Sequence, residues 1–429
     1  MNDTDKNNTV LRFLTCGSVD DGKSTLIGRL LFDTKTILTD TLSNIEKTSK
    51  KRGMSALDLS LITDGLQAER EQGITIDVAY RYFSTGTRKY IIADAPGHEQ
   101  YTRNMVTAAS TAELAIILID SRKGMLTQTK RHSYLAKLVG IKHIVVAINK
   151  MDLVEYDESK FKLICDEYKA FATAIDLIQP GVSLEFIPMS ALNGDMIVDR
   201  GSAMDWYEGS TLLNILENID VKKNINESSL RFPVQYICRP RESDNKDLHD
   251  FRAFMGRIES GHMKINDKVK VLPSNHESKI KEIRIGESIL SNARYEQSVT
   301  VSLYDEIDIS RGDMIVHQND KLSAVKNFTA TVCWLSETDL TQNRTYLIMH
   351  TSRTSKAKIT DIYYKMNINS TEKEPASILK TNDIASVGFK LAQPLIVDTY
   401  IENRETGSFI IVDESSYHTV GAGMIESLD

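Results

Sequence analysis

Cysteine is scarce in this sequence and widely spaced. The 429 residues include four cysteines, at Cys16, Cys165, Cys238 and Cys333. No two of them form a C-x-x-C pair, so their spacing excludes a zinc knuckle and a dithiol redox motif. Isolated thiols are typical of a reducing compartment, and we therefore expect a cytoplasmic protein.

Long apolar runs and an excess of positive charge are also missing. No stretch is long enough to span a bilayer, and the polar residues 1–9 lack the apolar core of a signal peptide. The chain has 52 Lys and Arg against 59 Asp and Glu, a net charge of −7. This balance argues against nucleic acid or a membrane as a partner. Contents of 41% hydrophobic and 26% charged residues indicate a globular protein of roughly two to three domains.

Residues 17–24 contain a phosphate-binding motif. They match G-x-x-x-x-G-K-[ST], between an apolar run (11–16) that predicts a buried strand and a run (25–31) with helical spacing. Two glycines allow the loop to point backbone N–H groups at phosphate oxygens, and the start of the helix adds more. We expect Lys23 to contact the β- and γ-phosphates and Ser24 to bind Mg²⁺.

A threonine switch is predicted after this loop. The long polar segment 33–70 is interpreted as a lid over the nucleotide, since long loops in compact domains are often functional. It is followed by Thr75, whose hydroxyl is expected to bind Mg²⁺ and the γ-phosphate and to release them after hydrolysis. A lone threonine is weak evidence, because threonine is common in strands. Its position between two phosphate-contacting motifs gives it weight.

An Asp-x-x-Gly motif follows a predicted hairpin (78–84 and 89–93) that turns near Gly86. Asp94 ends the second strand, where phosphate-loop enzymes hold Mg²⁺ with an aspartate. Gly97 allows the backbone to approach the γ-phosphate. His98 is expected to orient the attacking water; a histidine outside this motif would be interpreted as a surface residue.

Base recognition is predicted at the end of the strand 143–148, where Asn149, Lys150, Met151 and Asp152 follow. The carboxylate of Asp152 accepts from N1–H and the N2 amine of guanine, whereas adenine presents neither donor. Two charge-assisted hydrogen bonds of about 1.5–3 kcal/mol each predict a preference for GTP over ATP of ~10²–10⁴. Strand ends of open α/β sheets are where ligands bind.

The motifs together indicate a guanine-nucleotide switch built on a mostly parallel sheet with helices on both faces. Residues expected to contact GTP are Gly17, Ser18, Val19, Asp20, Asp21, Gly22, Lys23, Ser24, Thr25, Asp94, Ala95, Pro96, Gly97, His98, Asn149, Lys150, Met151, Asp152, Ser190, Ala191 and Leu192. Residues expected to act in hydrolysis are Lys23, Thr75 and His98, and those expected to bind Mg²⁺ are Ser24, Thr75 and Asp94.

The second half changes from helical to alternating periodicity at Arg231. Short β-rich runs separated by glycines predict one all-β barrel and then a second. We expect a phosphate-loop GTPase domain (1–222) followed by two β-barrel domains (230–320 and 323–429). Neither barrel contains a recognisable catalytic constellation.

The motifs resemble those of the translation-factor class of GTPases, which carry a histidine after the Asp-x-x-Gly motif. Within that class, residues 17–31, 64–83, 98–105, 247–252 and 403–411 resemble the GTPase subunit of bacterial sulfate adenylyltransferase. The resemblance covers nearly the whole chain. It departs at Ala95, where the family usually has threonine, a position whose side chain is not needed for the metal or the phosphate.

The resemblance implies a partner, the small catalytic subunit of sulfate adenylyltransferase, in a heterodimer or higher assembly. That subunit makes adenosine 5′-phosphosulfate and pyrophosphate from ATP and sulfate, and GTP hydrolysis drives the reaction. The resemblance also makes Val19 and Ile74 the apolar pair that shields the water from the histidine. Some relatives carry a fused kinase domain; the sequence has no second phosphate loop, so we expect no kinase activity.

The competing hypothesis is an elongation-factor-like GTPase that delivers charged tRNA. It has the same fold and the same GTP site, and it predicts a salt-sensitive RNA complex. The acidic charge balance and the family-specific motifs count against it.

Overall fold

The computed structural model describes residues 10–37, 45, 59–62, 77–97, 102–221, 229–239, 251–342 and 344–428. Thr75, His98 and most of the predicted lid therefore lie outside the described residues. The chain divides into two compact units, Met1–Val221 with Asn367–Glu372, and Lys222–Met366 with Lys373–Asp429. None of the helices described is long and apolar enough to cross a membrane.

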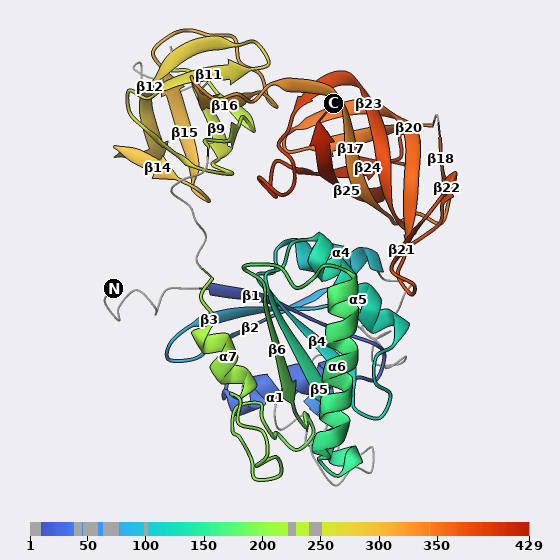
Figure 1. The fold of residues 1–429 in the computed structure, drawn as a ribbon. Coiled ribbons are helices and arrows are strands. Elements are labelled where there is room, and N and C mark those ends of the chain that lie inside the picture. Colours follow the sequence, from blue (N-terminus) through green and yellow to red (C-terminus); the bar gives the residue numbers. More distant parts are fainter. Residues whose placement is uncertain are drawn as a thin grey trace. The chain divides into compact units, whose positions relative to one another are not determined.

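A six-stranded sheet forms the centre of the first unit (Figure 1), in the spatial order β2-β3-β1-β4-β5-β6. The edge strand β2 is antiparallel to β3, and every other neighbouring pair is parallel. The strands are β1 (Val10–Gly17), β2 (Ala79–Ser84), β3 (Lys89–Asp94), β4 (Leu114–Asp120), β5 (His143–Asn149) and β6 (Ser183–Pro188).

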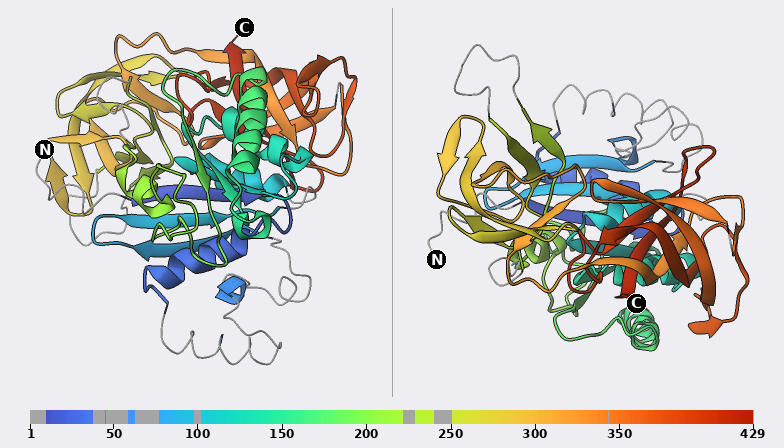
Figure 2. Two further views of the ribbon diagram at one scale, coloured as in Figure 1. Left: turned by 60° about the horizontal axis from the view of Figure 1, so that its bottom comes forward. Right: turned by 90° about the horizontal axis from the view of Figure 1, so that it is seen from above.

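Helices cover both faces of this sheet, as predicted, with α1 on one side and α5 and α6 on the other (Figure 2, left). The α-helices are α1 (Lys23–Asp33), α4 (Thr102–Ser110), α5 (Thr127–Leu138), α6 (Glu158–Ala174) and α7 (Leu212–Asn218). Two short 3-10 helices are η2 (Leu59–Ile62) and η4 (Met151–Val154).

Burial on both faces explains why the sequences of the central strands are continuous apolar runs. All seven residues of β4 are buried, and so are six of the seven residues of β5. Strands covered on both faces lose the alternation of a half-exposed strand. Because β1, β3, β4, β5 and β6 run in the same direction, their carboxyl ends meet at one edge of the sheet, where the predicted nucleotide motifs begin.

Helix α6 lies outside all of the predicted motifs. Its buried residues recur every three to four positions, among them Phe161, Ile164, Tyr168 and Phe171, which is the spacing of an amphipathic helix. The side chain of Asp157 caps its start by accepting a hydrogen bond from the backbone N–H of Ser159 at 2.8 Å.

The second unit begins with a sheet that runs in the order β7-β16-β11-β12-β15-β9-β8, with β13 paired to β12. Two chain-adjacent strands, β7 and β8, occupy the two ends of this path, so the sheet curls round to bring its ends together. The strands are β7 (Phe232–Pro233), β8 (Tyr236–Cys238), β9 (Ala253–Arg257), β11 (Lys268–Leu272), β12 (His276–Ile285), β13 (Ser288–Leu290), β15 (Ser298–Leu303) and β16 (Met314–His317). A separate pair consists of β10 (His262–Lys264) and β14 (Asn292–Arg294).

The alternating pattern over 232–238 predicts one continuous strand, and the structure divides it. The N–H of Val234 bonds to the carbonyl of Asp313, whereas the N–H of Gln235 bonds to the carbonyl of Met255. The backbone thus changes partner from the β16 side to the β9 side within two residues. This exchange is what brings the ends of the curled sheet together.

The second barrel is closed by hydrogen bonds. Its order is β19-β24-β25-β17-β23-β20-β21, and β19 also pairs with β20, which completes a six-stranded ring with β21 outside it. The strands are β17 (Ala324–Trp334), β19 (Thr345–His350), β20 (Arg353–Asn367), β21 (Glu372–Glu374), β23 (Ile384–Ile396), β24 (Ser408–Val412) and β25 (Thr419–Leu428), with the small pair β18 (Leu340–Thr341) and β22 (Ile378–Leu379) beside them. The predicted fold class, an α/β unit followed by two β-barrels, is confirmed.

Candidate nucleotide-binding site

The phosphate loop joins β1 to α1 and is held by its own side chains. Gly22 precedes the first residue of α1 with φ of 95°, a left-handed conformation that glycine adopts without steric cost. A Cβ on Gly22 would clash with Nδ2 of Asn149, so a side chain at this position would displace the asparagine. The carboxylate of Asp21 accepts a hydrogen bond from the N–H of Ser18 at 2.6 Å, which closes the loop.

Lys23 points back into this loop. Its Nζ donates to the carbonyls of Gly17 at 3.0 Å and Ser18 at 2.9 Å, and the residue is only 7% exposed. Burial lowers the pKa of Lys23, and the carboxylates of Asp94 and Asp21 oppose this shift. A buried ammonium at the start of a helix, in a glycine-containing loop, suits an anionic ligand with several oxygens.

The loop after β3 lies against the lysine. A Cβ on Gly97 would be 2.5 Å from Nζ of Lys23 and 2.8 Å from the carbonyl oxygen of Gly17. The backbone of this loop therefore approaches the phosphate loop as closely as a residue without a side chain permits. The structure brings residues 94–97 together with the phosphate loop.

The oxygen donors near Lys23 suit a hard cation. Asp94 ends β3, is 2% exposed, and accepts a hydrogen bond from Oγ1 of Thr15 at 3.4 Å. Ser24 is the second residue of α1. A carboxylate and a hydroxyl are ligands that Mg²⁺ accepts. Oγ of Ser18 is buried without a hydrogen-bond partner among the described residues, a further polar group that a phosphate oxygen would satisfy.

Asn149 joins the phosphate loop to the last predicted motif. Its Nδ2 donates to the carbonyl of Asp21 at 2.8 Å, and its Oδ1 accepts from the N–H of Ala191 at 2.9 Å. Oγ of Ser190 donates to Oδ1 of Asp152 at 2.7 Å, which orients that carboxylate. Residues 149–152 and 190–191 are thus connected by direct hydrogen bonds to each other and to the phosphate loop, and the loop after β3 is the fourth loop of the site.

Leu192 differs from its neighbours in being exposed, at 58%, while Ala191 is 2% exposed. Its backbone is nevertheless fixed, because Arg29 from α1 donates from Nε to the carbonyl of Ala191 at 3.2 Å and from Nη2 to the carbonyl of Leu192. An exposed apolar side chain two residues after Ser190, which holds Asp152, could pack against a base.

Sequence reasoning missed Asp120, which ends β4 at the same edge of the sheet and pairs in register with Asn149. Its side chain forms ion pairs with Lys150 and Arg122. The available signal was the same as for Asp94, an acidic residue directly after an apolar strand.

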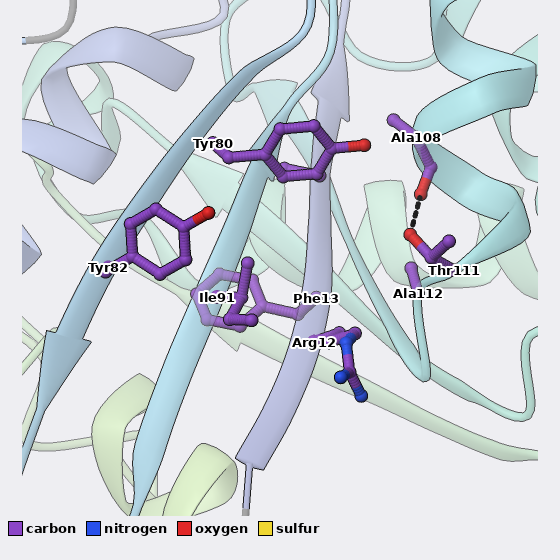
Figure 3. A pocket seen from close by; sticks show the side chains of 9 residues that line it. Arg12, Phe13, Tyr80, Tyr82, Ile91, Ala108, Thr111 and Ala112 are labelled. Atoms are coloured by element: carbon purple, nitrogen blue, oxygen red, sulfur yellow. Dashed lines mark hydrogen bonds between the residues drawn. The ribbon is translucent and has the colours of Figure 1, made fainter. Parts of the chain in front are cut away.

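A hollow of about 250 Å³ lies elsewhere on the first unit (Figure 3). Tyr80 and Tyr82 from β2, Ile91 from β3 and Arg12 from β1 line it, together with Thr111 just beyond α4. None of the predicted nucleotide-contacting residues lines this hollow.

Similarity to known proteins extends over nearly the whole chain. The family profile described as "Elongation factor Tu GTP binding domain" matches residues 8–224, and "GTP-eEF1A C-terminal domain-like" matches residues 327–426. A solved structure described as "Crystal Structure Analysis of sup35 complexed with GDP" covers 98% of this chain and 94% of its own, with 21% identity and a TM-score of 0.44.

Curated relatives are far more similar in sequence. "Sulfate adenylyltransferase subunit 1" of Colwellia psychrerythraea is 51% identical over 98% of this chain and 88% of its own length. The protein of the same name from Teredinibacter turnerae is 50% identical over the same shares. "Bifunctional enzyme CysN/CysC" of Rhodopirellula baltica is 49% identical over 97% of this chain and 63% of its own length. The chain therefore belongs to the family of sulfate adenylyltransferase subunit 1, and its first half belongs to the elongation factor Tu family of GTP-binding domains.

Proposed function

We propose that this chain is the GTP-hydrolysing subunit of a sulfate adenylyltransferase. The observation that carries the proposal is the 51% identity to a protein of that name over 98% of the chain. The geometry of the first unit supports the nucleotide half of the proposal, because four motif loops meet at one edge of the sheet.

The phosphates of GTP would lie in the loop between β1 and α1. Backbone N–H groups of the loop and of the first turn of α1, which have no acceptor inside the helix, would donate to phosphate oxygens. Lys23 would exchange its two backbone carbonyl acceptors for the β- and γ-phosphates. The N–H of Gly97 would meet the γ-phosphate, and this contact would distinguish GTP from GDP.

Asp152 would select guanine. Its carboxylate, oriented by Ser190, accepts from the two donors that guanine presents and adenine lacks. Lys150 would lie along one face of the base and Leu192 along the other. Asn149 would keep the base loop and the phosphate loop at a fixed separation.

Mg²⁺ would be held by Ser24, Asp94 and Thr75, the last of which lies outside the described residues. When bound, the ion neutralises phosphate charge and fixes the β- and γ-phosphates in one geometry. We propose that His98, also outside the described residues, orients the attacking water. The sequence offers no obvious arginine finger, so we expect slow intrinsic hydrolysis, on the order of 10⁻⁴ s⁻¹, and stimulation by a partner.

The partner would be the small catalytic subunit, in a heterodimer or higher assembly. There a sulfate oxygen attacks the α-phosphorus of ATP, the bond to the β-phosphate bridge breaks, and adenosine 5′-phosphosulfate and pyrophosphate result. This reaction is uphill, and hydrolysis of GTP to GDP and phosphate on this chain would drive it. We propose that residues 1–222, 230–320 and 323–429 act as three domains in this coupling.

Pyrophosphate release from ATP and sulfate tests the proposal, with this chain mixed with the small subunit from the same genome. We expect release that requires GTP and that is lost with Lys23→Ala or a non-hydrolysable GTP analogue. GTP hydrolysis without sulfate-dependent release would contradict the assigned reaction while leaving the nucleotide site intact. The elongation-factor alternative rests on the fold alone, and a tRNA-binding assay would be the next measurement in that case.

A further inference from the structure

Asp120 is a buried carboxylate beside the predicted guanine loop. It is the last residue of β4, and it lies opposite Asn149 in the parallel pairing of β4 with β5. The residue is 1% exposed, and its side chain is fully buried in both of its ion pairs. A buried carboxylate needs several donors to remain ionised at moderate cost, and the contacts of Asp120 supply them.

One of these donors is Lys150. Its Nζ lies 3.1 Å from Oδ2 of Asp120 and also donates to the backbone carbonyl of Asp20 in the phosphate loop. The ammonium is therefore held between the end of β4 and the phosphate loop. The backbone of Lys150 is fixed too, with φ of 62° and its carbonyl accepting from Oγ of Ser121 at 2.9 Å.

The other donors come from Arg122. Its Nε and Nη2 bond to the two carboxylate oxygens of Asp120 at 3.0 and 2.7 Å, and its backbone N–H bonds to Oδ1 at 3.0 Å. Although burial alone would raise the pKa of Asp120, the hydrogen bonds from Arg122 and Lys150 hold it well below its usual range. The carboxylate therefore stays charged and keeps one orientation, with Oδ2 directed at the lysine.

We propose that Asp120 is a positioning residue for guanine-nucleotide binding, acting through Lys150. It fixes the lysine ammonium against the phosphate loop, so that the aliphatic part of the side chain is aligned along the plane of the base before the nucleotide arrives. The inference deepens the proposed function and rests on it. A side chain held in this way loses no rotamer freedom on binding.

A purely structural role for Asp120 is the alternative, in which it serves to hold Arg122 and the turn after β4. The two roles differ in what Lys150 does. If Asp120 acts through Lys150, removing the carboxylate from a chain that already lacks the ammonium has no further effect on nucleotide binding. If Asp120 acts through the turn, the two changes add, because they affect independent features.

Dissociation of a fluorescent GDP analogue from the full chain tests the proposal, with Asp120→Asn, Lys150→Met and the double variant. We expect each single variant to release GDP about tenfold faster, equal to about 1.4 kcal/mol, and the double variant to be no faster than Lys150→Met. For Asp120→Asn, the kcat for GTP at saturation should stay within about twofold, because the carboxylate itself contacts neither the nucleotide nor the attacking water. Asp157→Asn, the same substitution at the cap of α6, is the matched control and should release GDP at the wild-type rate.

Additive effects in the double variant, or an unchanged rate in Asp120→Asn, would overturn the proposal. If Asp120→Asn does not fold, as thermal unfolding would show, the Arg122→Gln variant distinguishes the positioning role from the structural one. This variant removes a side chain that is 46% exposed and leaves the pair of Asp120 with Lys150. The proposal predicts slower GDP release than from Lys150→Met, because Lys150 and the backbone N–H of residue 122 still hold the carboxylate. The structural alternative predicts release at least as fast as from Lys150→Met. A wild-type chain that binds no GDP would contradict the proposed function instead.

Discussion

Arg231 and Asp398 are 167 positions apart in the chain and form a buried, two-bond ion pair. Nε of the arginine donates to Oδ2 of the aspartate at 2.8 Å, and Nη2 donates to Oδ1 at 2.7 Å. The remaining nitrogen, Nη1, donates to Asp320 at 2.7 Å. Arg231 lies at the start of the first barrel, Asp320 in the segment between the barrels, and Asp398 in the second barrel. A single guanidinium therefore joins the two barrels.

Apolar side chains from both barrels also pack against one another. Leu272 and Met314 of the first barrel and Ile396 of the second belong to one buried cluster. The two barrels have separate main cores but are joined by this small cluster and by the ion pairs of Arg231, which is consistent with their forming one compact unit.

Arg231→Ala should destabilise the second unit strongly. The substitution leaves the carboxylates of Asp398 and Asp320 buried without their cation, a change that costs about 3–5 kcal/mol. Urea unfolding followed by circular dichroism would measure the loss. Lys356→Ala, which breaks the exposed pair with Glu414, is the control and should unfold like the wild type. An Arg231 variant as stable as the Lys356 variant would show that the buried pair contributes little.

Gly97→Ala should weaken GTP binding more than GDP binding. The new methyl group would lie 2.5 Å from Nζ of Lys23, which can move, and 2.8 Å from the carbonyl of Gly17, which cannot. Loss of the close approach to the γ-phosphate should lower the affinity for GTP at least about tenfold, or about 1.4 kcal/mol. Calorimetric titration with GDP and a non-hydrolysable GTP analogue would measure the difference.

Gly86→Ala is the matched control for this change. Gly86 lies in the turn between β2 and β3, and apart from Gly86 and its two chain neighbours no described residue has an atom within 4 Å of the position that an alanine methyl group would take there. Its nucleotide affinities should equal those of the wild type. Equal losses for GDP and GTP in the Gly97 variant would mean that the residue shapes the loop without sensing the γ-phosphate.

Asp152→Asn should change the base preference from guanine to xanthine. Xanthine carries a carbonyl oxygen where guanine carries the N2 amine, so the amide N–H₂ of asparagine complements it. Loss of two charge-assisted bonds predicts a fall in GTP affinity of ~10²–10⁴, with a gain for XTP. Competition of each nucleotide against a fluorescent analogue would report both changes. An equal loss of affinity for GTP and XTP would contradict the prediction. It would indicate that the variant only disturbs the contact with Ser190 and that other residues select the base.

The sequence allowed the nucleotide motifs to be located because each is a short contiguous pattern at the end of an apolar strand. Asp94 and residues 149–152 could be placed at one edge of a parallel sheet from connectivity alone. The amphipathic helix α6 was also predictable, since Phe161, Ile164 and Tyr168 carry the required spacing.

Other features depend on which strands are neighbours in the folded chain, and they could not be predicted from the sequence. Asp120 can act on the guanine loop because it lies opposite Asn149, and nothing in the local sequence pattern specifies that β4 neighbours β5. The exchange of partners between Val234 and Gln235 likewise depends on which strands flank them. The pairing of Arg231 with Asp398 joins segments too far apart for any periodicity to connect.

The stability of the first unit should depend on pH through His132. This residue of α5 is 1% exposed, and burial, assisted by the charges of Lys23 and Arg131, lowers its pKa from 6.5 to about 3. The folded chain therefore keeps the ring neutral at pH values where the unfolded chain binds a proton. The unfolded state binds more protons between these two values, so stability should fall as pH drops from 6.5 toward 3, by up to about 1.4 kcal/mol per pH unit from this group.

His132→Gln tests this dependence, because glutamine cannot take up a proton in the unfolded state. Its absolute stability is expected to differ from that of the wild type, so the informative quantity is the difference in unfolding free energy between pH 7 and pH 5 within each protein. Urea unfolding at the two pH values should give a smaller difference for the variant. If the two proteins lost the same stability over this interval, the acid sensitivity of the unit would arise from groups other than His132, and the ring would have to be protonated in the folded chain despite its burial beside Lys23.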